Sequence, residues 1–386
     1  AIEDEHERKV VADHVLHFGQ TPSQLFRKKQ AARTVKSKKG FWTVEDMKMN
    51  LALIKGSSKT SIRHCSIVNG RIMTIDQDAF VHYYKWITPN LSTSFTFTAS
   101  VSADFNIEFD KTSELLRKQY GSTLGQSNNH FAVLGKSNVL LSVGHWDNSI
   151  RCYNLDDMKC FQSVSCHKDA ITCVAVGYEE RVVVTGSRDT TVIVWTIGKA
   201  GKYSQATLQE SPQHILYGHQ NEVSCIAVSV TLDLVISASM DGDILFHTLE
   251  DGLYIRDAQL PNCSVPTKMI VNGFHGAICI YCQQDLKLYT MTVNGKILAA
   301  TDIGERINSM SFTFEGQHIL LGGEKGSIHV RDATSLEVKE ILRSKNSPIT
   351  NVIPTPEDCL VASNGEGEFI LVSPESSMAK KSRSWN

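Results

Sequence analysis

The sequence predicts an all-β fold built from repeated units of short strands, preceded by a short α-helical segment. From about residue 47 to residue 373 the chain is a succession of short apolar runs separated by Gly, Asp and Asn, the residues that favour tight turns. One pattern recurs along this region with constant internal spacing. Residues 1–26, by contrast, place apolar side chains at helical spacing.

Length and composition allow one large all-β region with an extension. The chain has 386 residues, of which 41% are hydrophobic, and a formal net charge of −2. No run approaches the ~18 uncharged apolar residues of a membrane span, and no secretory signal pattern begins the sequence. The charge balance gives no reason to expect nucleic-acid binding. Because the first residue is Ala, inside a charged helix-like run, we interpret the sequence as a fragment of a longer protein.

The ten cysteines are scattered singly through predicted strands. The one Cys-x-x-Cys pair, Cys279 and Cys282, lies in an apolar run. In a strand, positions three apart point to opposite faces, so these two thiols are badly placed to chelate one metal. We expect buried, reduced thiols in a cytosolic protein.

The clearest repeat runs from Val182 to Trp195. It consists of two apolar strands around a tight turn that holds Asp189, with an aromatic residue six positions after that Asp. Further copies, some weaker, give a count of seven turns along the chain. These turns lie near Asp78, Asp147, Asp189, Asp241, Asp285, Lys325 and Glu366.

Two copies carry an upstream His at the same distance from their turn. His167 precedes Asp189 by 22 residues (189 − 167), and His219 precedes Asp241 by 22 residues (241 − 219). This spacing resembles the WD-repeat signature, in which a Gly-His corner precedes each blade and Trp-Asp closes its third strand. The resemblance implies a seven-bladed WD-repeat β-propeller.

The same resemblance implies a hydrogen-bond chain inside a blade. The His would bond the turn Asp, and a strand Ser or Thr would link the His to the strand aromatic. Thr185 or Ser187 is the candidate link in one blade, and Ser237 or Ser239 in the next. We therefore assign two structural sets, namely His167, Asp189, Trp195 and Ser187, and His219, Asp241 and Ser239, with His247 in place of the second Trp. Repeated triads of this kind indicate scaffolding, because a catalytic triad occurs once.

A propeller has to close its ring to protect its strand edges. After Val372 almost no strand-forming sequence remains, whereas residues 47–54 are strand-like and precede the first repeat. We predict that this early strand pairs beside the last one. The predicted closure residues are Met47, Met49, Leu51, Leu53, Phe369 and Leu371. The 69-residue gap between the first two turns (147 − 78) predicts an insertion over about 88–129, which includes a strand-like run at 94–101.

The N-terminal segment indicates the wider family. The string from Phe18 to Phe26 resembles the end of a BEACH domain, with Phe18, Gly19, Gln20, Thr21 and Pro22 as its motif. Gly19 ends the predicted helix and Pro22 cannot continue it. The predicted organisation is a BEACH end at 1–26, a basic linker at 27–46, a propeller at 47–373 and a flexible tail at 374–386. A BEACH end followed by WD repeats resembles the BEACH–WD scaffold proteins, and the propeller is most similar to the neurobeachin and LPS-responsive beige-like anchor branch.

This resemblance implies a non-enzymatic protein-interaction scaffold. It would act in vesicle trafficking, membrane-protein sorting or kinase anchoring, in the cytosol and at intracellular membranes. Its partners would be proteins bound at propeller faces and loops, and the adjacent BEACH domain. No phosphate loop, metal-ligand set or nucleophile elbow occurs in the sequence, so we assign no catalytic residue, cofactor or metal. We interpret His64, His82 and His130 as isolated.

Two features leave other binding modes open. The basic run from Arg27 to Lys39 predicts, as an alternative, peripheral contact with an anionic membrane at ~1 kcal/mol per charge; a solvated linker is the simpler interpretation. Phe105, Phe109 and Tyr120 of the insertion are candidate partner anchors, because aromatic side chains often dominate interfaces. Packing of the insertion on the propeller is an equal alternative.

Overall fold

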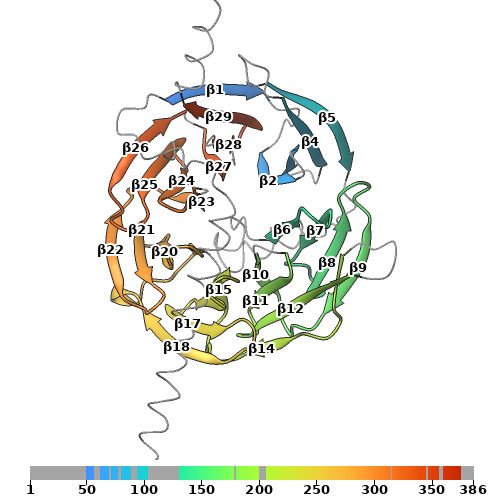
Figure 1. Ribbon diagram of the computed structural model, residues 1–386, viewed down its shortest axis with the longest axis vertical. Helices are drawn as coiled ribbons and strands as arrows, with labels where there is room; N and C mark the ends of the chain where they lie inside the picture. The colour runs from blue at the N-terminus through green and yellow to red at the C-terminus, as the bar shows by residue number, and fades with distance from the viewer. Residues whose placement is uncertain are drawn as a thin grey trace, which may run out of the picture. The chain divides into compact units, whose positions relative to one another are not determined.

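The computed structural model describes residues 49–55, 61–68, 71–76, 80–87, 94–102, 130–177, 180–199, 206–313, 315–344, 347–355 and 360–374. These residues form seven antiparallel β-sheets arranged as blades around a common centre (Figure 1). The predicted all-β, seven-bladed propeller is confirmed. The predicted BEACH end at 1–26, its motif residues and the basic linker at 27–46 lie outside the described residues, as does the tail after residue 374.

Strands follow one another from the centre of each blade to its rim. Blade 1 contains β2 (Ile62–Val68), β3 (Arg71–Asp76), β4 (Phe80–Ile87) and β5 (Ser94–Ser102), and blade 2 contains β6 (Phe131–Leu134), β7 (Val139–Ser142), β8 (Ser149–Asn154) and β9 (Cys160–Ser165). Blade 3 contains β10 (Ile171–Val176), β11 (Val182–Ser187) and β12 (Val192–Lys199), with β13 (Ala206–Leu208) and β14 (His214–Leu216) both paired to β12. Blade 4 contains β15 (Val223–Ser229), β16 (Leu234–Ser239), β17 (Asp243–Thr248) and β18 (Tyr254–Gln259).

The remaining three blades repeat this order. Blade 5 contains β19 (Lys268–Val271), β20 (Ala277–Cys282), β21 (Lys287–Thr292) and β22 (Ile297–Asp302), and blade 6 contains β23 (Ile307–Phe312), β24 (His318–Gly323), β25 (Ser327–Asp332) and β26 (Val338–Arg343). Blade 7 contains β27 (Ile349–Pro354), β28 (Leu360–Asn364), β29 (Glu368–Pro374) and, on its outside, β1 (Met49–Lys55). Between blades 4 and 5 a single 3₁₀ turn covers Pro261–Cys263.

A strand's place in its blade sets its pattern of burial. All six residues of β20 are buried, whereas the outer strand β22 alternates between partly buried and exposed positions. The middle strands are sandwiched between neighbouring blades, so both of their faces need apolar side chains. Cys279 packs in the cluster shared with blade 6, and Cys282 in the cluster shared with blade 4. The two thiols therefore point to opposite faces of β20, and both are free and buried.

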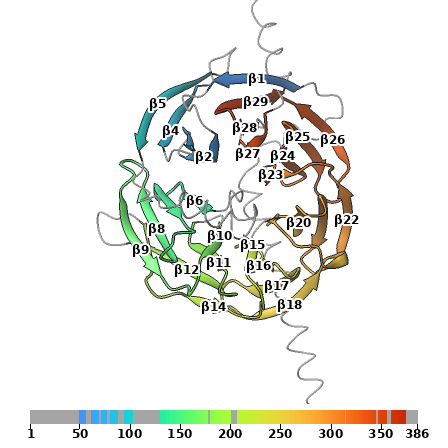
Figure 2. The same ribbon diagram turned by 180° about the vertical axis from the view of Figure 1, so that it is seen from behind.

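The ring is closed by β1, the first strand of the described residues (Figure 2). β1 pairs antiparallel with β29, and Leu51 lies opposite Val372 in this register. The sheet order β1-β29-β28-β27 makes β1 the outer strand of blade 7. At the seam with blade 1, the rings of Tyr84 and Phe369 meet edge to face at 4.8 Å. Met47 lies outside the described residues.

The outer strand of blade 1 corrects the predicted insertion. Residues 94–102 form β5, which pairs with β4 over the whole length of β4. The run at 94–101 therefore belongs to the blade rather than to an insertion at 88–129, because an outer strand needs the same β-forming residues as any other strand. The stretch 103–129 between β5 and β6, with Phe105, Phe109 and Tyr120, lies outside the described residues.

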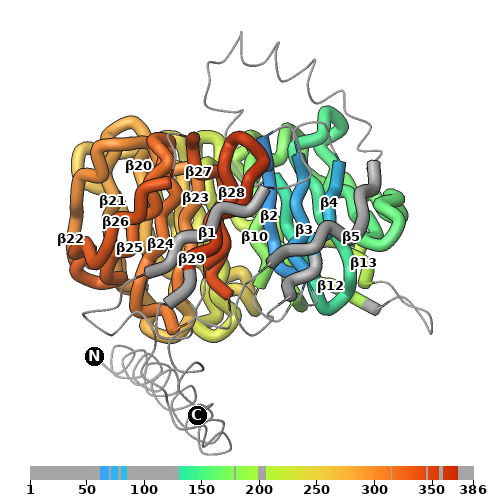
Figure 3. Tube along the Cα trace, turned by 90° about the horizontal axis from the view of Figure 1, so that it is seen from above, coloured from blue at the N-terminus to red at the C-terminus, as the bar shows by residue number. Residues whose placement is uncertain are grey.

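Bulges in the innermost strands tie neighbouring blades together. β10 and β15 each carry a register shift next to their second residue, Thr172 and Ser224. Thr172 donates its hydroxyl to the Val223 carbonyl at 2.5 Å, and Ser224 donates to the Pro266 carbonyl at 2.6 Å. Because a bulge re-aims its extra side chain, each of these residues reaches the next blade while it also contacts a carbonyl of its own blade, at 3.1 Å for Thr172 and 3.2 Å for Ser224. Figure 3 shows the strands running through the depth of the ring, with turns gathered on its two faces.

Candidate functional site

The polar chain of blade 3 is buried and continuous. His167 Nδ1 lies 3.1 Å from a carboxylate oxygen of Asp189, and His167 Nε2 lies 2.9 Å from the Thr185 hydroxyl. Trp195 Nε1 donates to the same hydroxyl oxygen at 2.9 Å. The donors are consistent with one tautomer, in which His167 donates from Nδ1 and accepts at Nε2. His167, Thr185 and Trp195 are all buried.

Thr185, rather than the assigned Ser187, is therefore the link in this chain. Ser187 instead donates to the Asp169 carbonyl at 2.9 Å and accepts the backbone N–H of Asp189 at 3.1 Å. The register explains the correction, because Trp195 lies opposite Val183. Thr185 is then its diagonal neighbour on the same face, within reach of a long side chain, and Ser187 lies one further step away.

Blade 4 departs further from the expected set. His219 Nε2 lies 2.7 Å from the hydroxyl of Ser237, so the assigned Ser239 is again not the link. Ser239 donates to the Asp241 carboxylate, and the backbone N–H of Asp243 donates to it at 3.3 Å. His219 Nδ1 has no hydrogen-bond partner among the described residues, so the expected His219–Asp241 bond is absent there. Blade 3 places Thr191 beside both its His and its Asp, and blade 4 has Asp243 at that position.

Two other blades hold acid–histidine pairs that the spacing rule did not predict. His82 Nε2 lies 3.0 Å from the Asp76 carboxylate, so the interpretation of His82 as isolated was wrong. In blade 6, His329 Nε2 lies 2.8 Å from Glu305, which also accepts the backbone N–H of Lys325 at 2.9 Å. Here the acid comes from the loop and the histidine from the strand, which is the reverse of blade 3. A search for upstream histidines alone cannot find this arrangement.

Burial sets the electrostatics of these groups. Desolvation lowers the pKa of His219 to about 4, and it lowers the pKa of His167 below its ordinary value although Asp189 opposes it. Burial alone would raise the pKa of the Asp189 carboxyl, but hydrogen bonds from Thr191 and the backbone of Lys168 hold it below its ordinary value. These histidines are thus neutral hydrogen-bonding groups at neutral pH. Among the described residues, no three His, Cys, Asp or Glu side chains cluster as a metal site.

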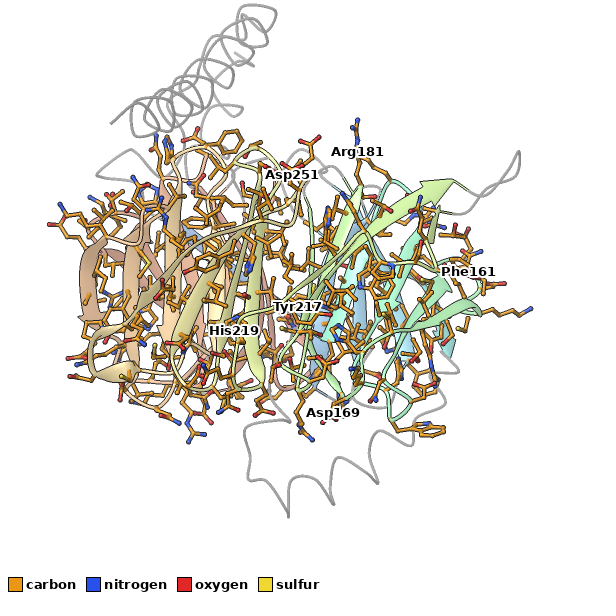
Figure 4. All side chains as sticks on the ribbon, turned by 90° about the horizontal axis from the view of Figure 1, so that it is seen from below. Phe161, Asp169, Arg181, Tyr217, His219 and Asp251 are labelled. Carbon is orange, nitrogen blue, oxygen red and sulfur yellow. The ribbon has the colours of Figure 1, made fainter. Side chains whose placement is uncertain are left out.

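Exposed apolar side chains gather on the outer wall where blades 3 and 4 meet. Tyr217 is 68% exposed, Leu253 61% and Tyr254 56%. Ile215 and Ile255 are also exposed large hydrophobic residues, and we call these five residues the blade 3–4 wall. In Figure 4, Tyr217 lies on the side of the ring, between Asp251 near one face of the ring and Asp169 near the other.

Contacts between the two blades make this wall one continuous surface. His214 Nε2 lies 2.7 Å from the Glu250 carbonyl, which holds β14 against the turn before β18. A Cβ at Gly252 would lie 2.7 Å from the His214 ring, so only glycine permits this approach. The ring of His247 packs edge to face on Tyr254 at 5.8 Å. Burial lowers the pKa of His247, and a hydrogen bond that its ring donates to the Tyr217 backbone partly offsets this effect.

Sequence reasoning missed this wall because its residues lie in, or directly beside, strands that look like ordinary blade elements. The usable signal was local. Tyr217 follows the third repeat, and Leu253–Ile255 follow the fourth; all of these are large apolar residues. Trp146, 71% exposed in the turn between β7 and β8, and Phe274, 57% exposed in the turn before β20, are also strongly exposed aromatic residues, but neither has comparable exposed apolar neighbours on its own turn.

Comparison with known proteins places the whole propeller in one group. The sequence profile of the neurobeachin beta propeller domain matches residues 51–382. BEACH domain-containing protein B of Arabidopsis thaliana is 31% identical over 98% of this chain and 15% of its own length. BEACH domain-containing protein lvsE of Dictyostelium discoideum is 25% identical over 69% of this chain and 13% of its own length. The chain thus spans a small fraction of these relatives. No helix in the described ranges has the length and apolar character of a membrane span.

Proposed function

Because this chain belongs to the neurobeachin β-propeller family, we propose that it is a non-enzymatic protein-interaction scaffold whose main docking surface is the blade 3–4 wall. The observation that carries the proposal is the contrast between its polar and apolar residues. The described histidine–acid pairs are buried within blades, where they stabilise turns. The five large exposed apolar side chains of the blade 3–4 wall instead gather on one surface over two blades, which is typical of an interaction site.

Proximity labelling with the intact chain tests this function. The wall variant carries Tyr217→Ala, Leu253→Ala and Tyr254→Ala. A matched control carries Val338→Ala and Ile341→Ala, because these residues are exposed on the outer strand of blade 6. We expect a subset of labelled proteins to disappear with the wall variant and to remain with the control. Identical protein sets for all three chains, or no specific labelling, would overturn the proposal.

The cellular role is also a proposal, and the family supports it. We propose that the scaffold acts in vesicle trafficking and membrane-protein sorting, or in kinase anchoring, in the cytosol and at intracellular membranes. The similarity to BEACH domain-containing proteins supports this role. We also propose a BEACH domain as the neighbour of the propeller in the full-length protein. Fractionation of cells that express the tagged full-length protein should recover it in both cytosolic and membrane fractions, and strictly nuclear or secreted protein would contradict the proposal.

A direct membrane role is the second candidate, and the charge of the linker favours it. Residues 27–39 include seven Lys or Arg residues and no acidic residue. Such a cluster is attracted to an anionic leaflet. Liposome flotation should then recover the chain with anionic vesicles and lose it when the seven residues are changed to Gln. Equal recovery with neutral vesicles rejects the electrostatic mechanism.

A further inference from the structure

The surroundings of the blade 3–4 wall are strongly acidic. Residues 206–260 contain one basic residue other than histidine, Arg256, and eight acidic ones, whereas the whole chain is nearly balanced at 39 basic and 41 acidic residues. The acidic residues of this stretch are Glu210, Glu222, Asp233, Asp241, Asp243, Glu250, Asp251 and Asp257. The excess of acidic over basic residues is therefore local to the outer strands of blade 3 and to blade 4.

Several of these carboxylates border the apolar residues directly. Glu250 and Asp251 are exposed and are separated from the exposed Leu253 by Gly252 alone. Asp257 accepts the hydroxyl of Tyr254 at 2.7 Å, which places a carboxylate next to an exposed aromatic ring. Arg256 donates to the Asn294 carbonyl of blade 5 at 3.1 Å, so part of its hydrogen-bonding capacity is directed away from the wall.

This combination selects a class of partner. Carboxylates beside exposed tyrosine rings attract Lys and Arg through charge and through cation–π contact. The apolar residues of the wall require apolar side chains between those basic residues. The same negative charge disfavours the phosphates of nucleic acids and of anionic lipids. Resting on the proposed scaffold function, we propose that the blade 3–4 wall binds a protein segment that alternates basic and apolar side chains.

The geometry of the edge strand indicates how such a segment is held. Ile255 is the extra residue of a register shift between β17 and β18, since Phe246 pairs with Arg256 and His247 pairs with Tyr254. A bulge in an outer strand disrupts its free edge and discourages the addition of another strand. The segment is therefore bound through its side chains, with the tyrosine rings as its principal contacts.

Selection from a phage-displayed library of random peptides, with the folded chain as bait, tests the proposal. We expect the recovered peptides to combine Lys or Arg with Leu, Phe or Tyr. Their binding should weaken at least about tenfold in Glu250→Lys with Asp251→Lys, and likewise in Tyr217→Ala with Tyr254→Ala, as measured by fluorescence anisotropy. Glu324→Lys with Glu366→Lys, which changes exposed turns of blades 6 and 7, should leave binding unchanged. Thermal unfolding of each variant verifies its fold.

The outcomes separate this inference from the scaffold function itself. Acidic or uncharged peptides, no enriched peptides, or binding that the wall substitutions do not change would overturn the inference. Proximity labelling that still depends on the wall would in that case leave the scaffold function standing. Recovery of basic, apolar peptides that are lost with both wall variants and retained by the turn variant supports the inference, and higher salt should weaken that binding.

Discussion

Replacement of Thr185 by Val tests the polar chain of blade 3 at its centre. One hydroxyl serves both His167 Nε2 and Trp195 Nε1, each at 2.9 Å. Valine has nearly the same shape, so the substitution removes the hydrogen bonds without opening a cavity. Each buried polar atom that loses its partner costs about 1–3 kcal/mol. We therefore expect the free energy of unfolding to fall by about 2–6 kcal/mol for the two atoms together.

Ser187→Ala is the matched control for this change. The Ser187 hydroxyl is also buried, but it serves one donor, the backbone N–H of Asp189, and otherwise donates to backbone carbonyls such as that of Asp169. Its loss leaves that single N–H without its partner, so it should cost about 1–3 kcal/mol. Urea unfolding followed by circular dichroism measures both variants. Hydrogen exchange of the Trp195 indole N–H adds a local readout, with faster exchange in Thr185→Val alone. A Thr185→Val cost below that of Ser187→Ala would refute the reasoning.

Three other predictions concern closure, pH and surface charge. Deleting residues 49–55 removes the strand paired with β29, so we expect the melting temperature to drop by roughly 10 °C or more, and an unchanged midpoint would contradict ring closure. Burial holds the pKa of His219 at about 4 against an ordinary 6.5, so between these pH values the unfolded chain binds a proton that the native chain does not. Stability therefore falls as the pH drops from 6.5 toward 4, by up to about 3 kcal/mol for this group. Because His64 and His145 also have pKa values lowered to about 4 by burial, His219→Gln should make that part of the urea-midpoint profile less steep, and an unaltered profile would disprove the assignment. Arg188→Ala breaks the 3.1 Å ion pair with Glu222 between neighbouring blades, but both side chains are about a quarter exposed, so a loss below about 1 kcal/mol is expected in urea unfolding, and one above about 2 kcal/mol would contradict it.

The repeated spacing predicted the ring because every blade buries its middle strands in the same way. A repeat such as Val182–Trp195 shows this burial in its own apolar pattern, and the count of such turns predicted the correct number of blades. The closure of the ring by β1 could also be predicted from the sequence, since a last blade without an outer strand leaves an unpaired edge. The sequence could not decide whether Thr185 or Ser187 links His167 to Trp195, because residues two apart share a face of the strand. Only the register with the strand of Trp195 distinguishes them.

The swapped pair in blade 6 and the blade 3–4 wall escaped prediction for a different reason. Glu305 and His329 meet across a loop and a strand, and no fixed spacing from blade 3 transfers to them. The wall joins Tyr217 of one blade to Tyr254 of the next through His247. Surfaces made by two repeats depend on how neighbouring blades meet, which a single repeat does not encode.

Hydrogen–deuterium exchange of the folded chain, with and without a selected basic, apolar peptide, tests the central claim most directly. Docking at the blade 3–4 wall predicts slower exchange in residues 213–217 and 250–257 when the peptide is bound. Residues 324–343 of blade 6 should exchange at the same rate in both states. Protection confined to blade 6, or no protection in blades 3 and 4, would contradict the assignment of this wall as the docking surface.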